Sequence, residues 1–273
     1  MHYRSAHGYR ACLASVFACH NQTLNVWTHL LGLGYFVSAA AAAAGRLSSR
    51  GATRPEALVT GVFFAGCILQ MAASAAYHIF GSGVGDARPG RAGGADRHAA
   101  FLKADLLGIA VMIAGAFAFG LFHGFVCAPF KSAFYMVTVA ALLLTAAALS
   151  LVDGVCALRV QERARTAAYS LCVLFGGVPV IEWYVTEGVT LPEHIRWLWL
   201  RACAAMFGFY GLGLVFFVTR FPERWAPGRF DLVGASHQLW HACVWAAGAA
   251  WAHGMLELAD FRAEQWAAGT LCR

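Results

Sequence analysis

The chain has 273 residues, of which 60% are hydrophobic and only 12% are charged, and its formal net charge at pH 7 is +6. A soluble domain has about 45–50% apolar and about 25% charged residues, so this composition excludes an ordinary soluble protein. The basic residues lie between long apolar runs, which argues against nucleic-acid binding and indicates a role in orienting the chain in a membrane.

Seven apolar runs of nearly bilayer-spanning length follow one another along the chain. About 20 apolar residues in a helix cross the hydrocarbon core of a bilayer. The expected helices cover residues 24–45, 57–80, 105–125, 132–153, 167–185, 195–218 and 238–256. We therefore predict an all-α, integral membrane bundle of seven transmembrane helices over 24–258, with a short N-terminal segment over 1–23 and a C-terminal tail over 259–273.

The connecting segments differ in their basic content. Those on the N-terminal side of the predicted bundle carry more Lys and Arg than those on the opposite side. Because cytosolic segments are enriched in these residues, the N-terminus is predicted to be cytosolic. Seven crossings then place the C-terminal tail in the lumen or outside the cell.

Nine cysteines are present, an odd number, and none forms a Cys-x-x-Cys pair. Most of them lie in or beside apolar runs, namely Cys67, Cys156, Cys172, Cys203 and Cys243. This pattern predicts small buried apolar residues, and neither a disulfide framework nor a zinc knuckle.

Polar residues converge at one depth of the predicted bundle. Ser74 and His78 end the second run on the cytosolic side, Asp105 begins the third run there, and His237 and His241 begin the seventh. Ionisable groups at membrane depth are costly and mark sites or ion pairs by default. The topology therefore brings three histidines, a carboxylate and a hydroxyl to one membrane face.

Two interpretations of these residues stay open from spacing alone. Three imidazoles with one position left for water suit a tetrahedral zinc site, in which Asp105 or Ser74 contacts the bound water. Alternatively, His237 and His241 are interfacial hydrogen bonders, since "SHQLWHA" lacks the glutamate of a zinc-protease helix.

Other embedded polar groups have simpler interpretations. Taken singly, His29, His123 and His253 are expected to be hydrogen bonders near helix ends. Glu182 and Arg201 fall at similar depth in neighbouring runs. We expect a structural ion pair between them, with contact to a ligand as the alternative.

Four segments carry a resemblance to a known family: "GYRACLASVFACHNQTLNVWTHLLG" (8–32), "SAAYHIF", "LKADLLGI" and "FPERWAPGRFDLVGASHQLWH" (221–241). In this order they resemble the progestin and adipoQ receptor family, which includes the adiponectin receptors and the haemolysin-III-like proteins. The resemblance implies seven helices, a cytosolic N-terminus and an intramembrane Zn²⁺. Its ligands would be His78, His237 and His241, and Ser74 and Asp105 match further family positions. Gln22 departs from the family pattern, because it replaces an acidic residue.

The resemblance also implies two functions. The first segment and "GVPVIEWYVTEG" look most like the third family member, a Golgi protein implicated in tethering Raf kinase. A receptor or scaffold in the Golgi or plasma membrane would bind a signalling kinase or other cytosolic protein through a face that includes residues 3–21. The alternative is a zinc-dependent hydrolase of a lipid amide such as ceramide, with Asp105 and Ser74 as catalytic residues and a ceramide or fatty acid as ligand.

Overall fold

A computed structural model describes residues 8–81, 93–152 and 158–272 of the chain, and these residues form helices and no strand. In chain order the elements are α1 (Tyr9–Ser15), α2 (Thr23–Ser49), α3 (Arg54–Ala76), the π-helical turn η1 (Tyr77–Gly81), α4 (Gly93–Gly124), α5 (Pro129–Leu151), α6 (Leu158–Phe175), α7 (Gly177–Val185), the short 3₁₀ turn η2 (Gly188–Thr190), α8 (Glu193–Thr219) and α9 (Ser236–Ala267). Residues 1–7 of the predicted N-terminal segment and Cys156 lie outside the described residues.

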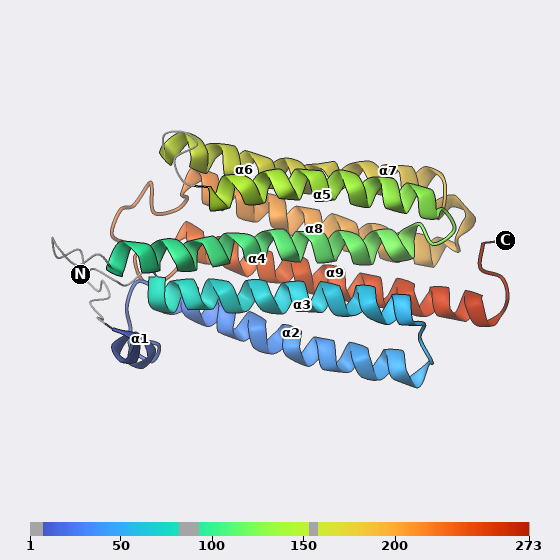
Figure 1. Ribbon diagram of the computed structural model, residues 1–273, viewed down its shortest axis with the longest axis horizontal. Coiled ribbons are helices and arrows are strands. Elements are labelled where there is room, and N and C mark those ends of the chain that lie inside the picture. The colour runs from blue at the N-terminus through green and yellow to red at the C-terminus, as the bar shows by residue number, and fades with distance from the viewer. Residues whose placement is uncertain (1–7, 82–92, 153–157, 273) are drawn as a thin grey trace.

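The long helices form an elongated bundle (Figure 1). Chain segments within the described residues provide six candidate membrane spans by length and composition, with α6, α7 and η2 counted as one. The remaining long helix, α9, runs alongside α8 and through the middle of the bundle, with the two described ends of the chain on opposite sides (Figure 1). The predicted all-α, seven-helix membrane bundle is therefore confirmed.

Two helices differ from their predicted bounds for identifiable reasons. The fifth run is broken at Gly176, and Pro179 lies in the first turn of α7, where its missing N–H costs no helical hydrogen bond. The last helix continues to Ala267, past the charges that end the predicted run. It does so because Glu257 and Asp260 are paired with Arg46 of α2 and with Arg50, which directly follows α2.

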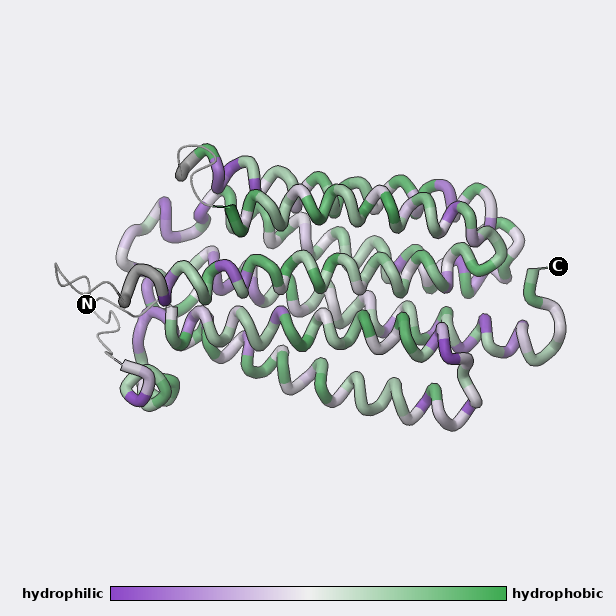
Figure 2. Tube along the Cα trace, in the orientation of Figure 1, coloured by the Kyte–Doolittle hydropathy of each residue, from purple (hydrophilic) through white to green (hydrophobic). Residues whose placement is uncertain are grey.

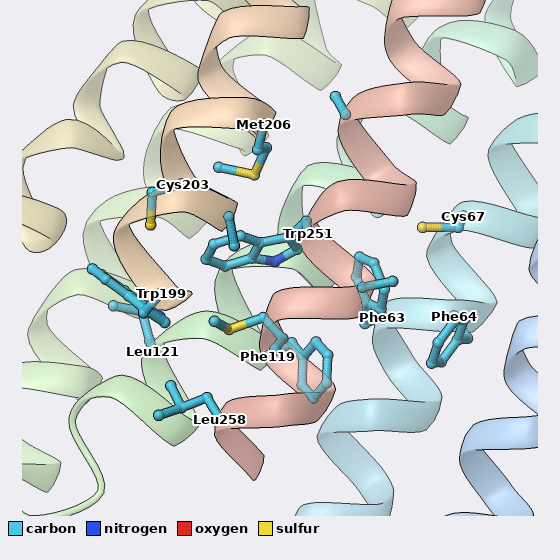
Figure 3. Close-up of a cluster of buried hydrophobic side chains, with 14 of the residues drawn as sticks. Phe63, Phe64, Cys67, Phe119, Leu121, Trp199, Cys203, Met206, Trp251 and Leu258 are labelled. Carbon is cyan, nitrogen blue, oxygen red and sulfur yellow. The ribbon is translucent and has the colours of Figure 1, made fainter. Parts of the chain in front are cut away.

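The core lies where α3, α4, α8 and α9 face one another. Figure 3 shows Trp251 of α9 at its centre, with Trp199 and Met206 of α8 on one side and Phe63 of α3 on the other. Most of each helix is apolar along its length, and hydrophilic residues recur mainly toward the ends of the bundle (Figure 2). Because lipid tails are as apolar as these side chains, the helices associate in a bilayer mainly through close van der Waals packing of such large and small residues.

Close approach of α3 and α4 fixes their relative register. A Cβ added at Gly108 would lie 2.9 Å from the Cα of Gln70, and one at Gly115 would lie 2.9 Å from the Cα of Phe63. Small residues at such positions let helix backbones meet in a membrane. Since the helices are antiparallel, Asp105, one turn before Gly108, comes level with Ser74, one turn after Gln70.

The cysteine prediction is correct in part. Cys67, Cys172, Cys203 and Cys243 are buried thiols. The prediction is wrong for Cys127 and Cys272, which form a disulfide between the α4–α5 connection and the chain segment after α9. An odd total of cysteines concealed this pair, although the predicted topology places both residues on the same side of the membrane.

The predicted ion pair between Glu182 and Arg201 is also wrong. Glu182 accepts hydrogen bonds from Tyr135 Oη and from Lys131 Nζ, the latter at 2.8 Å. Equal depth in the membrane does not fix the direction in which a helix points its side chains. Lys131 and Tyr135 lie one turn apart on α5, and both side chains are in contact with the Glu182 carboxylate.

Candidate metal centre

His78 lies in the π-helical turn that follows α3 and is buried. Such turns are rare and are frequently found at functional sites. Its Nδ1 lies 2.9 Å from Oε1 of Gln22, and Asn25 Nδ2 donates to the same oxygen at 3.0 Å. Because an amide oxygen only accepts, Nδ1 carries the proton and Nε2 keeps the lone pair that a metal needs.

The start of α9 is held by side-chain hydrogen bonds, and this positions His237 and His241. Oε1 of Gln238 accepts from the backbone N–H groups of Gly234 and Ala235, at 2.7 and 3.2 Å. Glu223, in the α8–α9 connection, accepts from the backbone N–H of Ser236 at 2.8 Å and from its hydroxyl.

Glu223, in the α8–α9 connection, places a negative charge beside the start of α9. Partial burial raises the pKa of Glu223, but the hydrogen bonds from Ser236 outweigh burial and lower it below the ordinary value for glutamate. Glu223 is therefore a carboxylate at neutral pH, close to the histidines of α9.

The structure brings the three predicted histidines together. The ring centroids of His78 and His237 are 5.3 Å apart, those of His78 and His241 are 4.9 Å apart, and those of His237 and His241 are 4.3 Å apart. The Nε2 atoms of His237 and His241 are separated by 3.1 Å. Two zinc–nitrogen bonds of about 2.0–2.1 Å at the tetrahedral angle need a separation of about 3.3 Å, so this pair has nearly the spacing of two ligands.

A fourth histidine belongs to the cluster, and sequence reasoning missed it. His29 of α2 was expected to be an interfacial hydrogen bonder, but it is 1% exposed and its ring lies 4.1 Å from that of His241. One nitrogen from each of His29, His78 and His241 lies within 4.8 Å of the other two. His29 lies one turn after Asn25 and Val26 in "NVWTHLLG", and only the structure shows that these residues are buried on the same face.

Ser74 and Asp105, the other predicted site residues, lie beside this cluster. Oγ of Ser74 is 2.9 Å from Nε2 of His29, and Asp105 is within hydrogen-bonding reach of the same hydroxyl. A hydroxyl has one proton, so donation to an ionised Asp105 requires Ser74 to accept from His29. His29 Nε2 would then be protonated. Its Nδ1 lies 3.3 Å from Sδ of Met71, which leaves His29 poorly placed as a ligand.

The donor set fits zinc. His78 of η1 and the pair His237 and His241 of α9 bring three imidazoles together from two parts of the chain, and neutral imidazole is a favourable ligand for Zn²⁺. Three neighbouring imidazoles that share no carboxylate are held together most strongly when a cation binds between them. Gln22 supplies the hydrogen bond to a ligand's second nitrogen that such sites commonly contain.

A cavity of about 760 Å³ reaches the histidine cluster. It runs between α4, α6, α8 and α9, and residues from all four helices line it. Its lining includes His78, His237, His241, Ser74 and Asp105. Most of the lining is apolar, for example Ile109 and Ile113 of α4, Val173 of α6 and Leu214 of α8. Its volume and lining suit an apolar molecule that carries a polar group.

Fold and site together define a class: a multi-pass helical membrane protein with a histidine cluster beside an apolar cavity. Residues 17–253 match the sequence profile described as haemolysin-III related. The chain belongs to this family, which confirms the family assignment made from the sequence motifs.

Individual relatives agree with this assignment. The chain is 33% identical to the adiponectin receptor protein of Drosophila melanogaster, over 93% of this chain and 54% of that protein. It is 30% identical to progestin and adipoQ receptor-like protein 1 of Caenorhabditis elegans, over 92% and 55%. It is 26% identical to progestin and adipoQ receptor family member 3 of Mus musculus, over 88% and 74%. The chain thus spans about half the length of the first two relatives.

Proposed function

We propose that this protein is a membrane receptor or regulator that holds Zn²⁺ with His78, His237 and His241 and binds a lipid in the adjoining cavity. The observation that carries the proposal is the continuity of the cavity with the histidine cluster. Relatives named as adiponectin and progestin receptors support a receptor role. A bound zinc ion would tie η1, at the end of α3, to α9 and act as a Lewis acid toward a polar ligand group.

Metal analysis of the purified protein tests the ligand set. We expect about one zinc per chain in the wild type, as for a single four-coordinate site. His237→Ala should lose zinc, whereas His29→Ala should keep it, because both nitrogens of His29 have other neighbours. His194→Ala, at the start of α8 and far from the cluster, is the matched control. Zinc-free wild type, or loss confined to His29→Ala, would overturn the assignment.

The orientation has two independent supports. The basic residues favour a cytosolic N-terminus. The Cys127–Cys272 disulfide lies at the opposite end of the bundle, and disulfides persist in oxidising compartments such as the secretory lumen. In sealed vesicles, an N-terminal tag should be cleaved by external protease added from the cytosolic side, and a protected tag would contradict the proposal.

From the resemblance to the third family member we further propose a Golgi location and a scaffold role toward Raf kinase. The surface available at the N-terminal end includes α1, whose Tyr9 and Leu13 are exposed, and Phe17, which follows it and is also exposed. Fluorescence microscopy with Golgi and plasma-membrane markers tests the location. Co-precipitation of Raf kinase with the wild type, but not with a Leu13→Asp variant, tests the scaffold role.

A zinc-dependent lipid amide hydrolase is the second candidate, favoured by one observation: Asp105 and Ser74 line the same cavity as the histidines. We rank it second because the similar proteins are named as receptors. If purified protein hydrolyses ceramide, and Asp105→Asn abolishes turnover while zinc content stays constant, this candidate replaces the first. Absence of turnover on ceramides in the zinc-loaded wild type leaves the receptor proposal in place.

A further inference from the structure

A second hollow lies far from the histidine cluster, on the outside of α8 and α9. It is a groove of about 780 Å³ near the start of α8. Its floor is made of small residues, among them Ala202 and Ala205 of α8 and Gly254 of α9. A Cβ added at Gly254 would lie 2.2 Å from that of Ala202, so the two helices touch here and leave no room for side chains.

Arg201 lines this groove and is exposed. Among the residues that the structure describes, no carboxylate forms an ion pair with Arg201, since Glu182 is taken by Lys131 and Tyr135. The acid nearest in sequence, Glu193 at the rim, accepts a hydrogen bond from Nε1 of Trp197 at 3.1 Å. Charged side chains in membrane-spanning helices almost always face the interior or pair with an opposite charge. Arg201 does neither within the described part of the chain, and its exposed guanidinium is open to an anion that enters the groove.

The position of Arg201 along α8 places its side chain near the phosphate layer of a bilayer. It lies eight residues after the first residue of α8, or about 12 Å along the helix. The polar layer on each side of a bilayer is about 5–7 Å thick beyond the hydrocarbon core. The Cα of Arg201 is therefore just inside the hydrocarbon, from where a long arginine side chain reaches the phosphate layer.

The neighbouring side chains suit a phosphate. His194 and His253 line the groove beside Arg201, and both are exposed. Imidazole N–H groups and a guanidinium fork are donors that match phosphate oxygens, and arginine can bind two of them at once. The small residues of the floor leave space for an acyl chain along the α8–α9 seam.

We propose that this groove binds the headgroup of an anionic phospholipid from the leaflet at the C-terminal end of the bundle, with Arg201 contacting the phosphate. His253 and His194 are additional donors. The site is separate from the histidine cluster and its cavity, and it does not depend on the function proposed above.

Native mass spectrometry of the full chain, with phosphatidylglycerol and phosphatidylcholine titrated into detergent, tests the proposal. Wild type should bind phosphatidylglycerol more tightly than phosphatidylcholine. Arg201→Gln should weaken phosphatidylglycerol binding about tenfold, as expected for the loss of one charge-assisted hydrogen bond. Arg196→Gln is the matched control: it lies on α8 near the same end but outside the groove, and it should bind as the wild type does.

Four results would overturn the proposal: equal binding of the two lipids, equal loss in both arginine variants, full competition by inorganic phosphate, or dimers that disappear in Arg201→Gln. Phosphate competition would assign the site to the free anion, and dimers would assign it to a second copy of the chain. If Arg201→Gln does not fold, His253→Gln provides the same test. It changes an exposed residue and should weaken phosphatidylglycerol binding severalfold, and unchanged binding would count against the site.

Discussion

The two ends of the bundle hold their helices together by different chemistry. At the C-terminal end, opposite charges meet directly: Arg46 pairs with Glu257 at 2.8 Å and with Asp260, and Arg50 pairs with Glu56 and with Asp260 at 3.1 Å. A disulfide adds a covalent link. At the N-terminal end, imidazoles from α2, η1 and α9 gather around one another.

If the histidines hold Zn²⁺ as proposed, this difference separates an end whose charges are paired within the chain from an end that is stabilised by a ligand. Ion pairs supply both charges from the chain itself. Neutral imidazoles supply only donors, and their convergence is stabilised most when a cation binds between them. The C-terminal end is therefore expected to keep its structure in any metal-free preparation, and the histidine end is expected to loosen.

Removal of the metal by chelation should change the stability of the protein more than any of the substitutions below. A folded-state ligand present at 1,000 times its dissociation constant adds about 4 kcal/mol of stability. Removal of zinc by a strong chelator should therefore lower the thermal unfolding midpoint and increase hydrogen exchange at the start of α9. Exchange at the end of α9 should change less. A midpoint that is insensitive to chelation, in protein shown to contain zinc, would break the comparison.

The disulfide should have the next largest effect, at the other end. Cys127 and Cys272 are 145 residues apart, and removal of a native disulfide typically costs about 2–4 kcal/mol. The Cys127→Ser/Cys272→Ser variant should unfold at lower temperature with its zinc content unchanged. Cys19→Ser, which alters an exposed free thiol, is the control. Loss of zinc in the double variant would show that the two ends are coupled.

Asp260 offers a smaller, purely electrostatic test. It accepts from both Arg46 and Arg50, and Arg50 is largely buried. Asp260→Asn leaves the Arg50 charge less compensated and should destabilise the protein by about 1–3 kcal/mol. Glu264→Gln, on the exposed side of the same helix, should have almost no effect. The comparison is measured by thermal unfolding of the two variants at equal salt concentration.

Gln22 gives the finest test of the histidine end. Its oxygen fixes the proton on Nδ1 of His78. Gln22→Leu should lower zinc affinity about tenfold, the lower limit for loss of such a supporting contact, without altering the C-terminal end. Gln22→Glu should raise affinity above that of the leucine variant, because a carboxylate accepts the same hydrogen bond. Affinities follow from competition with a chelator of known strength, and identical values in all three proteins would remove Gln22 from the site.

The sequence predicts the fold well because each membrane helix is marked by the length of its own apolar run. It also predicts that His78, His237 and His241 approach one another, since topology alone sets their common depth. It fails where rotation about a helix axis matters. Glu182 pairs with Lys131 rather than with Arg201 at a similar depth. Depth alone also does not show that α2 turns His29 toward α9.

Covalent and paired features were also outside the reach of local reasoning. The seventh apolar run ends at residue 256, but the helix continues through Glu257 and Asp260, which pair with Arg46 of α2 in the fold. Their partners lie more than 200 positions away in the chain. The disulfide joins residues separated by 145 positions, and only the paired helices bring them together.

The π-helical turn at the end of α3 restricts which insertions and deletions the gene can accept. Each residue added or removed in a helix rotates all that follows by about 100°. His78 faces Gln22 and α9 only with the present number of residues after Gly66, which contacts α4. Single-residue length changes between Gly66 and His78 should therefore be far less tolerated than changes in the helix connections, even where they preserve every apolar residue.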